Sequence, residues 1–229
     1  MFFDTILLDA DNTIFDFDQC EHTALRETLA GAGLPFDDDI AKSYSSINDA
    51  LWKKLEQGMV TTDELRVRRF SELIEKCFTK MKMPDPQTLS EAFVSSLSRQ
   101  TILIENTESY MSELYRHCEI YIITNGIAEV QRSRFGKSTI KQYVKKVYIS
   151  GEIGAKKPDS RFFDIVLADI PQKDKSRIIV VGDSLSSDMQ GGKNAGLTTC
   201  LFDPHHKVRL PHPLCDYSVD RLDGVLWLS

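Results

Sequence analysis

The sequence predicts an α/β fold with a doubly wound, Rossmann-like parallel sheet and a helical cap inserted after the first strand. Two observations lead to this prediction. Short apolar runs rich in β-branched residues recur and end in polar or small residues, and helical patterns separate the later runs. Strands that are buried on both faces and alternate with helices are typical of parallel sheets. The interval between Thr13 and Thr124, in contrast, contains no convincing strand and far exceeds the roughly 30 residues of one β-α-β unit.

Five apolar runs are the expected strands. They occupy residues 5–8, 120–123, 147–149, 178–181 and 199–202. Ligands of open parallel sheets bind beyond the carboxyl ends of the strands. We therefore expect the functional residues directly after these runs.

The long interval has the three-to-four spacing of apolar residues that indicates amphipathic helices. Thr61 and Glu64 have the spacing of a capping box. We predict that residues 16–98 form a helical cap domain, and that residues 1–15 and 99–229 form the catalytic core. The insert leaves immediately after an acidic cluster, which favours a lid; an ordinary helical decoration is the alternative. The expected helices fall near residues 25–32, 40–55, 61–81 and 89–97.

Composition limits the classes of partner. A net charge of −6 and a pI of about 5.4 argue against a nucleic-acid polymer or an anionic membrane surface, but not against a small phosphorylated ligand. The five cysteines have no C-x-x-C spacing, which indicates neither a disulfide framework nor a zinc site. Reduced thiols, the absence of a signal-peptide pattern and the absence of long apolar runs predict a cytoplasmic protein.

Four acids crowd the segment "ILLDADNTIFDFD" at the end of the first apolar run, namely Asp9, Asp11, Asp16 and Asp18. Two carboxylates about 4 Å apart repel by about 1 kcal/mol in water and by about 4 kcal/mol at an effective dielectric constant near 20. We expect a positive group to stabilise some of them. Asp16 and Asp18 are interpreted as structural.

The other expected strands also end in polar groups. If the strands are adjacent and parallel, these groups meet at one edge of the sheet. Each segment alone has an ordinary explanation as a turn, a solvated loop or a helix cap, and only their joint occurrence favours a site. The segments are Thr124-Asn125-Gly126, Lys156-Lys157-Pro158 and Gly182-Asp183-Ser184, with Asp188 shortly after.

This set of groups suits phosphoryl transfer. Carboxylate oxygens of Asp9, Asp11 and Asp183 are ligands that Mg²⁺ accepts. Lys157 and the Thr124 hydroxyl offset the charge of a phosphate. A carboxylate that faces a phosphate can act as nucleophile, and a second one two residues on can act as general acid.

The chain resembles the haloacid dehalogenase-like hydrolase superfamily over nearly its whole length. The family's motifs correspond to Asp9-x-Asp11-x-Thr13, Thr124, Lys157 and Gly182-Asp183-x₄-Asp188. The insert is similar to the cap of subfamily I. Within it, "NDALWKKLEQGMVTTDELRVRRF", together with "ITNG", "GDSLSSD" and a late "HH", resembles the pyrimidine 5′-nucleotidases, which dephosphorylate nucleoside monophosphates, including noncanonical ones.

The resemblance implies specific roles. Asp9 is the nucleophile, and Asp11 is the general acid and base. Mg²⁺, with Mn²⁺ or Co²⁺ as alternatives, is held by the Asp9 side chain, the Asp11 backbone carbonyl and Asp183. Asp188 supports the metal through water. The residues assigned to the phosphoryl oxygens are Thr124, Lys157 and Asn125; Asn125 is equally compatible with a role in shaping the turn.

Lys157 is chosen over Lys156 because it directly precedes Pro158. Substrate choice is expected to lie in the insert, although core packing or a solvated face explains each candidate as well. The candidates are Asn48, Trp52, Arg68, Arg69 and Phe70. His205 and His206 are interpreted as solvent-facing or cap-docking, with a metal role as the less favoured alternative.

These inferences predict a Mg²⁺-dependent phosphatase that acts on nucleoside 5′-monophosphates through an aspartyl-phosphate. The partner would be a small phosphorylated metabolite, and the oligomeric state is not indicated. A sugar-phosphate phosphatase or phosphomutase with the same machinery is the alternative. A phospho-accepting signalling module is disfavoured, because such modules are small and use a lone central aspartate.

Overall fold

The computed structural model describes residues 2–78 and 83–228, and the chain separates into two compact units. One unit comprises Met1–Phe17 and Thr101–Ser229, and the other comprises Asp18–Gln100. The predicted boundaries, at residues 15/16 and 98/99, lie within two residues of this division. The predicted roles of the two parts as core and cap stay predictions.

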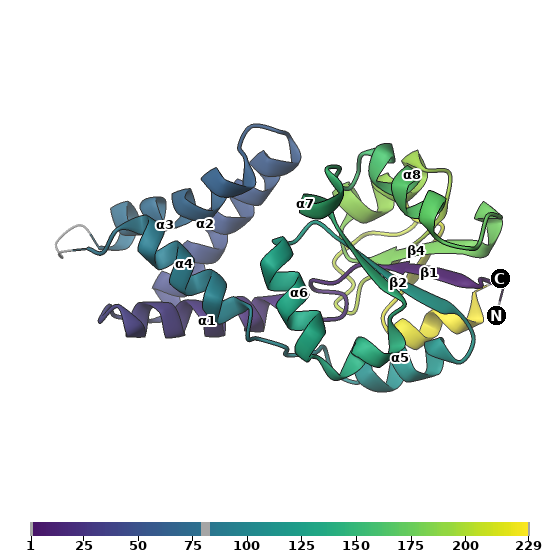
Figure 1. The fold of residues 1–229 in the computed structure, drawn as a ribbon, viewed down its shortest axis with the longest axis horizontal. Coiled ribbons are helices and arrows are strands. Elements are labelled where there is room, and N and C mark those ends of the chain that lie inside the picture. Colours follow the sequence, from purple (N-terminus) through teal and green to yellow (C-terminus); the bar gives the residue numbers. More distant parts are fainter. Residues whose placement is uncertain (1, 79–82, 229) are drawn as a thin grey trace. The chain divides into compact units, whose positions relative to one another are not determined.

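The first unit contains a six-stranded, fully parallel sheet with the strand order β3-β2-β1-β4-β5-β6 (Figure 1). The α/β parallel-sheet prediction is confirmed. The sixth strand was missed because it has three residues, all only partly buried, and so no apolar run marks it. The strands are β1 (Thr5–Leu8), β2 (Glu119–Thr124), β3 (Lys146–Ile149), β4 (Ile178–Gly182), β5 (Thr198–Phe202) and β6 (Tyr217–Val219).

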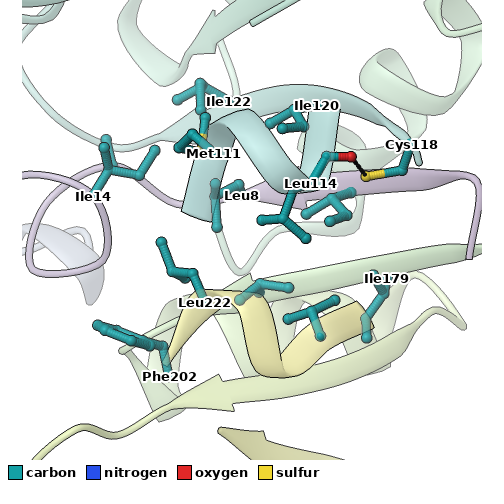
Figure 2. Close-up of a cluster of buried hydrophobic side chains, with 14 of the residues drawn as sticks. Leu8, Ile14, Met111, Leu114, Cys118, Ile120, Ile122, Ile179, Phe202 and Leu222 are labelled. Atoms are coloured by element: carbon teal, nitrogen blue, oxygen red, sulfur yellow. Dashed lines mark hydrogen bonds between the residues drawn. The ribbon is translucent and has the colours of Figure 1, made fainter. Parts of the chain in front are cut away.

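Successive side chains of the central strands lie on opposite faces of the sheet, as the two-residue period of a strand requires. In β1, Ile6 and Leu8 join one buried cluster and Leu7 joins the other. Figure 2 shows the first cluster, in which Met111 and Leu114 lie with Leu8 and Ile122. Both faces are thus covered, which explains the continuous apolar runs.

Helices cover each face of the sheet. Helix α5 and the C-terminal turn η4 pack on the first cluster, and α8 packs on the second (Figure 1). The remaining elements connect the strands. In chain order, the helices and turns of this unit are α5 (Thr107–Tyr115), α6 (Ala128–Lys137), η1 (Thr139–Tyr143), α7 (Ser150–Ile153), α8 (Ser160–Asp169), η2 (Lys175–Arg177), η3 (Leu185–Met189), α9 (Gln190–Asn194) and η4 (Leu222–Trp227).

The second unit is helical, and the four predicted helices are present. Thr61 and Glu64 form the expected capping box: the Thr61 amide donates to Glu64 Oε2 at 2.7 Å, and the Glu64 amide donates to Thr61 Oγ1 at 3.2 Å. The end predicted for that helix, Met81, lies outside the described residues, and the helix ends at Cys77. The helices are α1 (Phe17–Gly31), α2 (Asp38–Glu56), α3 (Thr62–Cys77) and α4 (Pro86–Leu97).

Within residues 2–78 and 83–228, no helix combines the length and the apolar character needed to cross a membrane.

Candidate active site

The register of the central strands brings the predicted site residues to one edge of the sheet. Leu8 of β1 pairs with Ile122 of β2 and with Val181 of β4. The pairing continues one residue further, because the Asp9 amide donates to the Val181 carbonyl at 2.9 Å. The residues that follow β1, β2 and β4 therefore lie beside one another, as expected for parallel strands.

The ammonium of Lys157 contacts groups from three different segments at this edge of the sheet. It donates to Asp9 Oδ1 at 2.5 Å, to Asp188 Oδ1 at 2.6 Å and to the Ile123 carbonyl at 2.8 Å. The Lys157 side chain is only 1 % exposed, so all three of its donors are used inside the protein. Positive charge thus compensates the acidic cluster, as the sequence required.

The electrostatics of the cluster remain unbalanced. Burial, with the neighbouring carboxylates of Asp188 and Asp183, holds the pKa of Asp9 above its ordinary value despite Lys157. Burial also opposes the charged form of Lys157, but Asp188 and Asp9 outweigh it and raise the pKa of the ammonium. The Lys157 ammonium contacts two of the three carboxylates, so the cluster holds more acidic groups than basic ones.

The acids are arranged as a cation site. One carboxylate oxygen each from Asp9, Asp183 and Asp188 lie within 4.8 Å of one another. Protein packed around its carboxyl group and the charge of Asp188 raise the pKa of Asp183 to about 7, although the residue as a whole reaches solvent. Asp183 borders solvent, whereas Asp9 and Asp188 are enclosed. Hard oxygen donors with one open side fit a divalent cation such as Mg²⁺.

Gly182 permits the close approach of Asp188. A Cβ atom at Gly182 would lie 2.3 Å from Asp188 Oδ2, so no other residue type fits without displacing that carboxylate. Asp188 Oδ2 also accepts from the Ser184 amide at 3.2 Å. Asp188 itself lies on η3, a single π-helical turn directly after β4, a structure that is frequent at functional sites.

Asn125 links two loops. Its Nδ2 donates to the Lys157 carbonyl at 2.9 Å, and its Oδ1 accepts from the Lys157 amide at 2.9 Å. Both ends of the amide are thereby engaged with backbone, as the turn-shaping alternative expects, and the contact of Asn125 with phosphate stays a prediction. Lys156, the competing lysine of the sequence, is not among the contacts of Asp9 or Asp188, whereas Lys157 contacts both.

Helix α6 adds two residues that the sequence did not indicate. Arg134 Nη1 donates to Asp11 Oδ1 at 2.5 Å, and Gln131 Nε2 donates to Asp11 Oδ2 at 2.7 Å. The sequence does contain one signal for these two residues: they are polar and lie three positions apart on the helix that follows Thr124. It is weak, because such pairs usually face solvent.

The cap candidates differ in accessibility. Three of them are enclosed in the second unit, as the core-packing alternative expects, and their contact with a substrate stays a prediction. Arg68 is exposed and pairs with Glu72, and Trp52 is partly exposed. The enclosed residues are Asn48, Arg69 and Phe70, each at most 1 % exposed.

His205 and His206 are both exposed, in agreement with the solvent-facing interpretation. Neither belongs to a group of potential metal ligands in the described part of the chain, where Asp9, Asp183 and Asp188 form the group that is found.

The fold and the site define a doubly wound α/β protein in which a cluster of carboxylates follows the strands of a parallel sheet. A family model described as haloacid dehalogenase-like hydrolase matches residues 6–202. The chain belongs to this family, as its sequence motifs predicted.

Similar proteins include two pyrimidine 5′-nucleotidases. YjjG of Escherichia coli (strain K12) is 31 % identical over 90 % of this chain and 89 % of its own length. PynA of Streptococcus pneumoniae (strain ATCC BAA-255 / R6) is 33 % identical over 90 % of this chain and 86 % of its own length. These relatives support a phosphatase.

A solved structure agrees with the fold over nearly the whole chain. The magnesium-bound HAD-hydrolase YfnB from Bacillus subtilis has a TM-score of 0.91 and 31 % identity, and the match covers 98 % of this chain and 97 % of that one.

Proposed function

We propose that this chain is a Mg²⁺-dependent phosphomonoesterase that hydrolyses nucleoside 5′-monophosphates, in particular pyrimidine nucleotides, including noncanonical ones. The observation that carries the proposal is the contact between Asp9 and Lys157 beside Asp183 and Asp188. A buried carboxylate, an ammonium and a cation site at one point are the groups that phosphate ester hydrolysis needs. The nucleotide specificity is proposed from the similarity to the two nucleotidases.

The chemistry assigned to the chain has two steps. An oxygen of Asp9 attacks phosphorus, the bond from phosphorus to the sugar oxygen breaks, and Asp11 gives that oxygen a proton. Water then attacks the aspartyl-phosphate, Asp11 takes a proton from it, and the bond from phosphorus to Asp9 breaks. The net reaction consumes one water and yields one alcohol and one phosphate.

The remaining groups hold the phosphate and the metal. The side chains of Asp9 and Asp183 and the backbone carbonyl of Asp11 would bind Mg²⁺, which supplies neutralising charge for the phosphate when bound. Asp188 accepts from Lys157 and so fixes the ammonium beside Asp9. The Thr124 hydroxyl and Lys157, whose ammonium would give up one of its three protein contacts, are the proposed contacts of the phosphoryl oxygens.

We infer that residues 16–98 act as the cap that selects the substrate. Trp52 and Arg68 remain candidates for contacting a base or sugar, because both reach the surface. Asn48, Arg69 and Phe70 are the other proposed candidates, and each of them is enclosed in this structure. Mn²⁺ and Co²⁺ are the proposed substitutes for Mg²⁺.

Phosphate release from a substrate panel tests the proposal. The panel contains pyrimidine and purine monophosphates, their deoxy forms and common sugar phosphates, each with Mg²⁺ and with chelator. Chelator-sensitive turnover that favours pyrimidine monophosphates is expected. Preference for sugar phosphates would support the same mechanism with a different substrate class, since the proposed residues of the core contact only the phosphate. Turnover by Asp9→Asn comparable to wild type would refute Asp9 as nucleophile.

A further inference from the structure

The polar network of helix α6 connects two residues with different proposed roles. Gln131 Nε2, which donates to Asp11 Oδ2, also donates to Thr124 Oγ1 at 2.9 Å. Arg134 Nη1, which donates to Asp11 Oδ1, also donates to Gln131 Oε1 at 3.3 Å. Both oxygens of Asp11 are therefore held by one face of one helix, and the same face reaches Thr124.

The network is buried, so its contacts are stronger and more specific than those of a surface pair. Gln131 and Arg134 are fully buried, and the Arg134 guanidinium lies 4.1 Å from the centre of the Phe15 ring. A buried guanidinium is costly without a compensating charge. Asp11 supplies such a charge, and its own side chain is 26 % exposed, so it also borders solvent.

Gly126 provides the space for the Gln131 amide. A Cβ atom at Gly126 would lie 2.4 Å from Gln131 Nε2 and 2.9 Å from Gln131 Cδ. The turn after β2 therefore leaves room for Gln131 to reach back to both Asp11 and Thr124.

Gln131 also determines what the Thr124 hydroxyl can do. Thr124 Oγ1 accepts from Gln131 Nε2 and from the Gly126 amide at 3.0 Å. A hydroxyl offers two lone pairs and one hydrogen. With both lone pairs engaged, Thr124 is left as a donor, and the described residues provide no acceptor for that hydrogen. A phosphoryl oxygen accepts hydrogen bonds, so it requires a hydroxyl that is oriented as a donor in this way.

We propose that Gln131 and Arg134 are positioning residues that fix the carboxyl group of Asp11 relative to the hydroxyl of Thr124. One bound ester then meets Asp11 at its leaving oxygen and Thr124 at a phosphoryl oxygen. The inference rests on the proposed phosphatase function and assigns two further residues to it. Neither residue touches the reacting atoms; both act through Asp11 and Thr124.

The test compares two esters with different leaving groups. A nucleoside monophosphate expels an alkoxide that needs a proton, whereas p-nitrophenyl phosphate expels a stable phenolate. We expect Arg134→Met and Gln131→Met to lower kcat/KM about 10- to 100-fold on the nucleotide and less than about 3-fold on the aryl ester, because misplacement of a catalytic group by about 1 Å costs about 100-fold. Arg134→Lys should recover part of the loss, since it restores a cation.

Arg132→Met is the matched control. Arg132 lies on the same helix but is exposed and pairs with Glu152 on the surface. It should leave the ratio of kcat/KM for the two esters unchanged. Gln131→Met should in addition raise KM for both esters, by less than about 3-fold, since the Thr124 hydroxyl loses one of the two groups that donate to it.

Equal losses on both esters for Arg134→Met and Gln131→Met would overturn the inference, because a structural role does not change that ratio. Thermal unfolding establishes that each variant is folded; if Arg134→Met is unfolded, Gln131→Met alone decides. Failure of the proposed function is separate: wild-type protein that releases phosphate from no ester, or an active Asp9→Asn variant, would refute the phosphatase itself.

Discussion

Replacing Lys157 by methionine removes the ammonium that contacts both Asp9 and Asp188. Methionine retains the length and apolar character of the side chain but provides no charge and no donor. The ammonium is fully enclosed and makes contacts of 2.5 and 2.6 Å to the two carboxylates. We therefore expect the unit that holds the site to lose stability in the absence of metal.

The magnitude follows from the burial of the pair. Removing one partner of a buried ion pair costs about 3–5 kcal/mol. Two carboxylates lose their partner here, but each can take up a proton, so the single-pair figure is the appropriate one. For chains of this length about 1 kcal/mol corresponds to a shift in Tm of about 2–4 °C. The expected fall in Tm is thus roughly 6–20 °C.

The assay is thermal unfolding followed by circular dichroism, first with chelator and then with Mg²⁺. Lys156→Met is the control, and it should lower Tm less than Lys157→Met does, because Lys156 is only partly buried. Adding Asp188→Asn to Lys157→Met should recover part of the loss, because one uncompensated carboxylate is removed. Mg²⁺ should raise the Tm of Lys157→Met more than that of wild type.

The reasoning is refuted if Lys157→Met unfolds within 2 °C of wild type in chelator, or if Lys156→Met has the larger effect. Either result would mean that the buried acids do not depend on the Lys157 ammonium for their stability.

Three further predictions concern single residues. Gly182→Ala should lower kcat about 10-fold or more and reduce Tm, because the new Cβ displaces the Asp188 carboxylate; unchanged kinetics would contradict that geometry. Asp11→Asn should slow phosphate release more from nucleoside monophosphates than from aryl phosphates, and equal losses would count against Asp11 as the general acid. Arg69→Met should leave Tm unchanged or raise it, because Nε and Nη2 of this buried side chain have no hydrogen-bond partner; a fall of more than about 4 °C would refute this explanation.

The local pattern of the sequence was sufficient to predict the central strands of the sheet and the polar residues that follow them. Strand β1 was predicted with its observed bounds, because a fully apolar run that ends in polar residues leaves little choice of structure. The capping box at Thr61 was predictable for the same reason, since both partners lie within one turn of helix. Strand β6 was not predictable, because its three residues can be recognised as a strand only by their pairing in the tertiary structure.

Contacts between distant residues were decided by the tertiary structure. Arg134 and Asp11 are separated by 123 positions, and nothing local indicates that the arginine is enclosed rather than solvated. The helical period likewise placed Asn48 and Arg69 on helix faces without saying that these faces turn inward.

The polar residues at the carboxyl edge of the sheet could thus be predicted without the structure, because they directly follow apolar strands. The contacts of Lys157 with Asp9 and Asp188, of Asn125 with the Lys157 backbone and of α6 with Asp11 could not be predicted in this way. The physical reason is that parallel pairing fixes which strand ends meet, whereas the direction of each side chain depends on packing from elements far away in the chain.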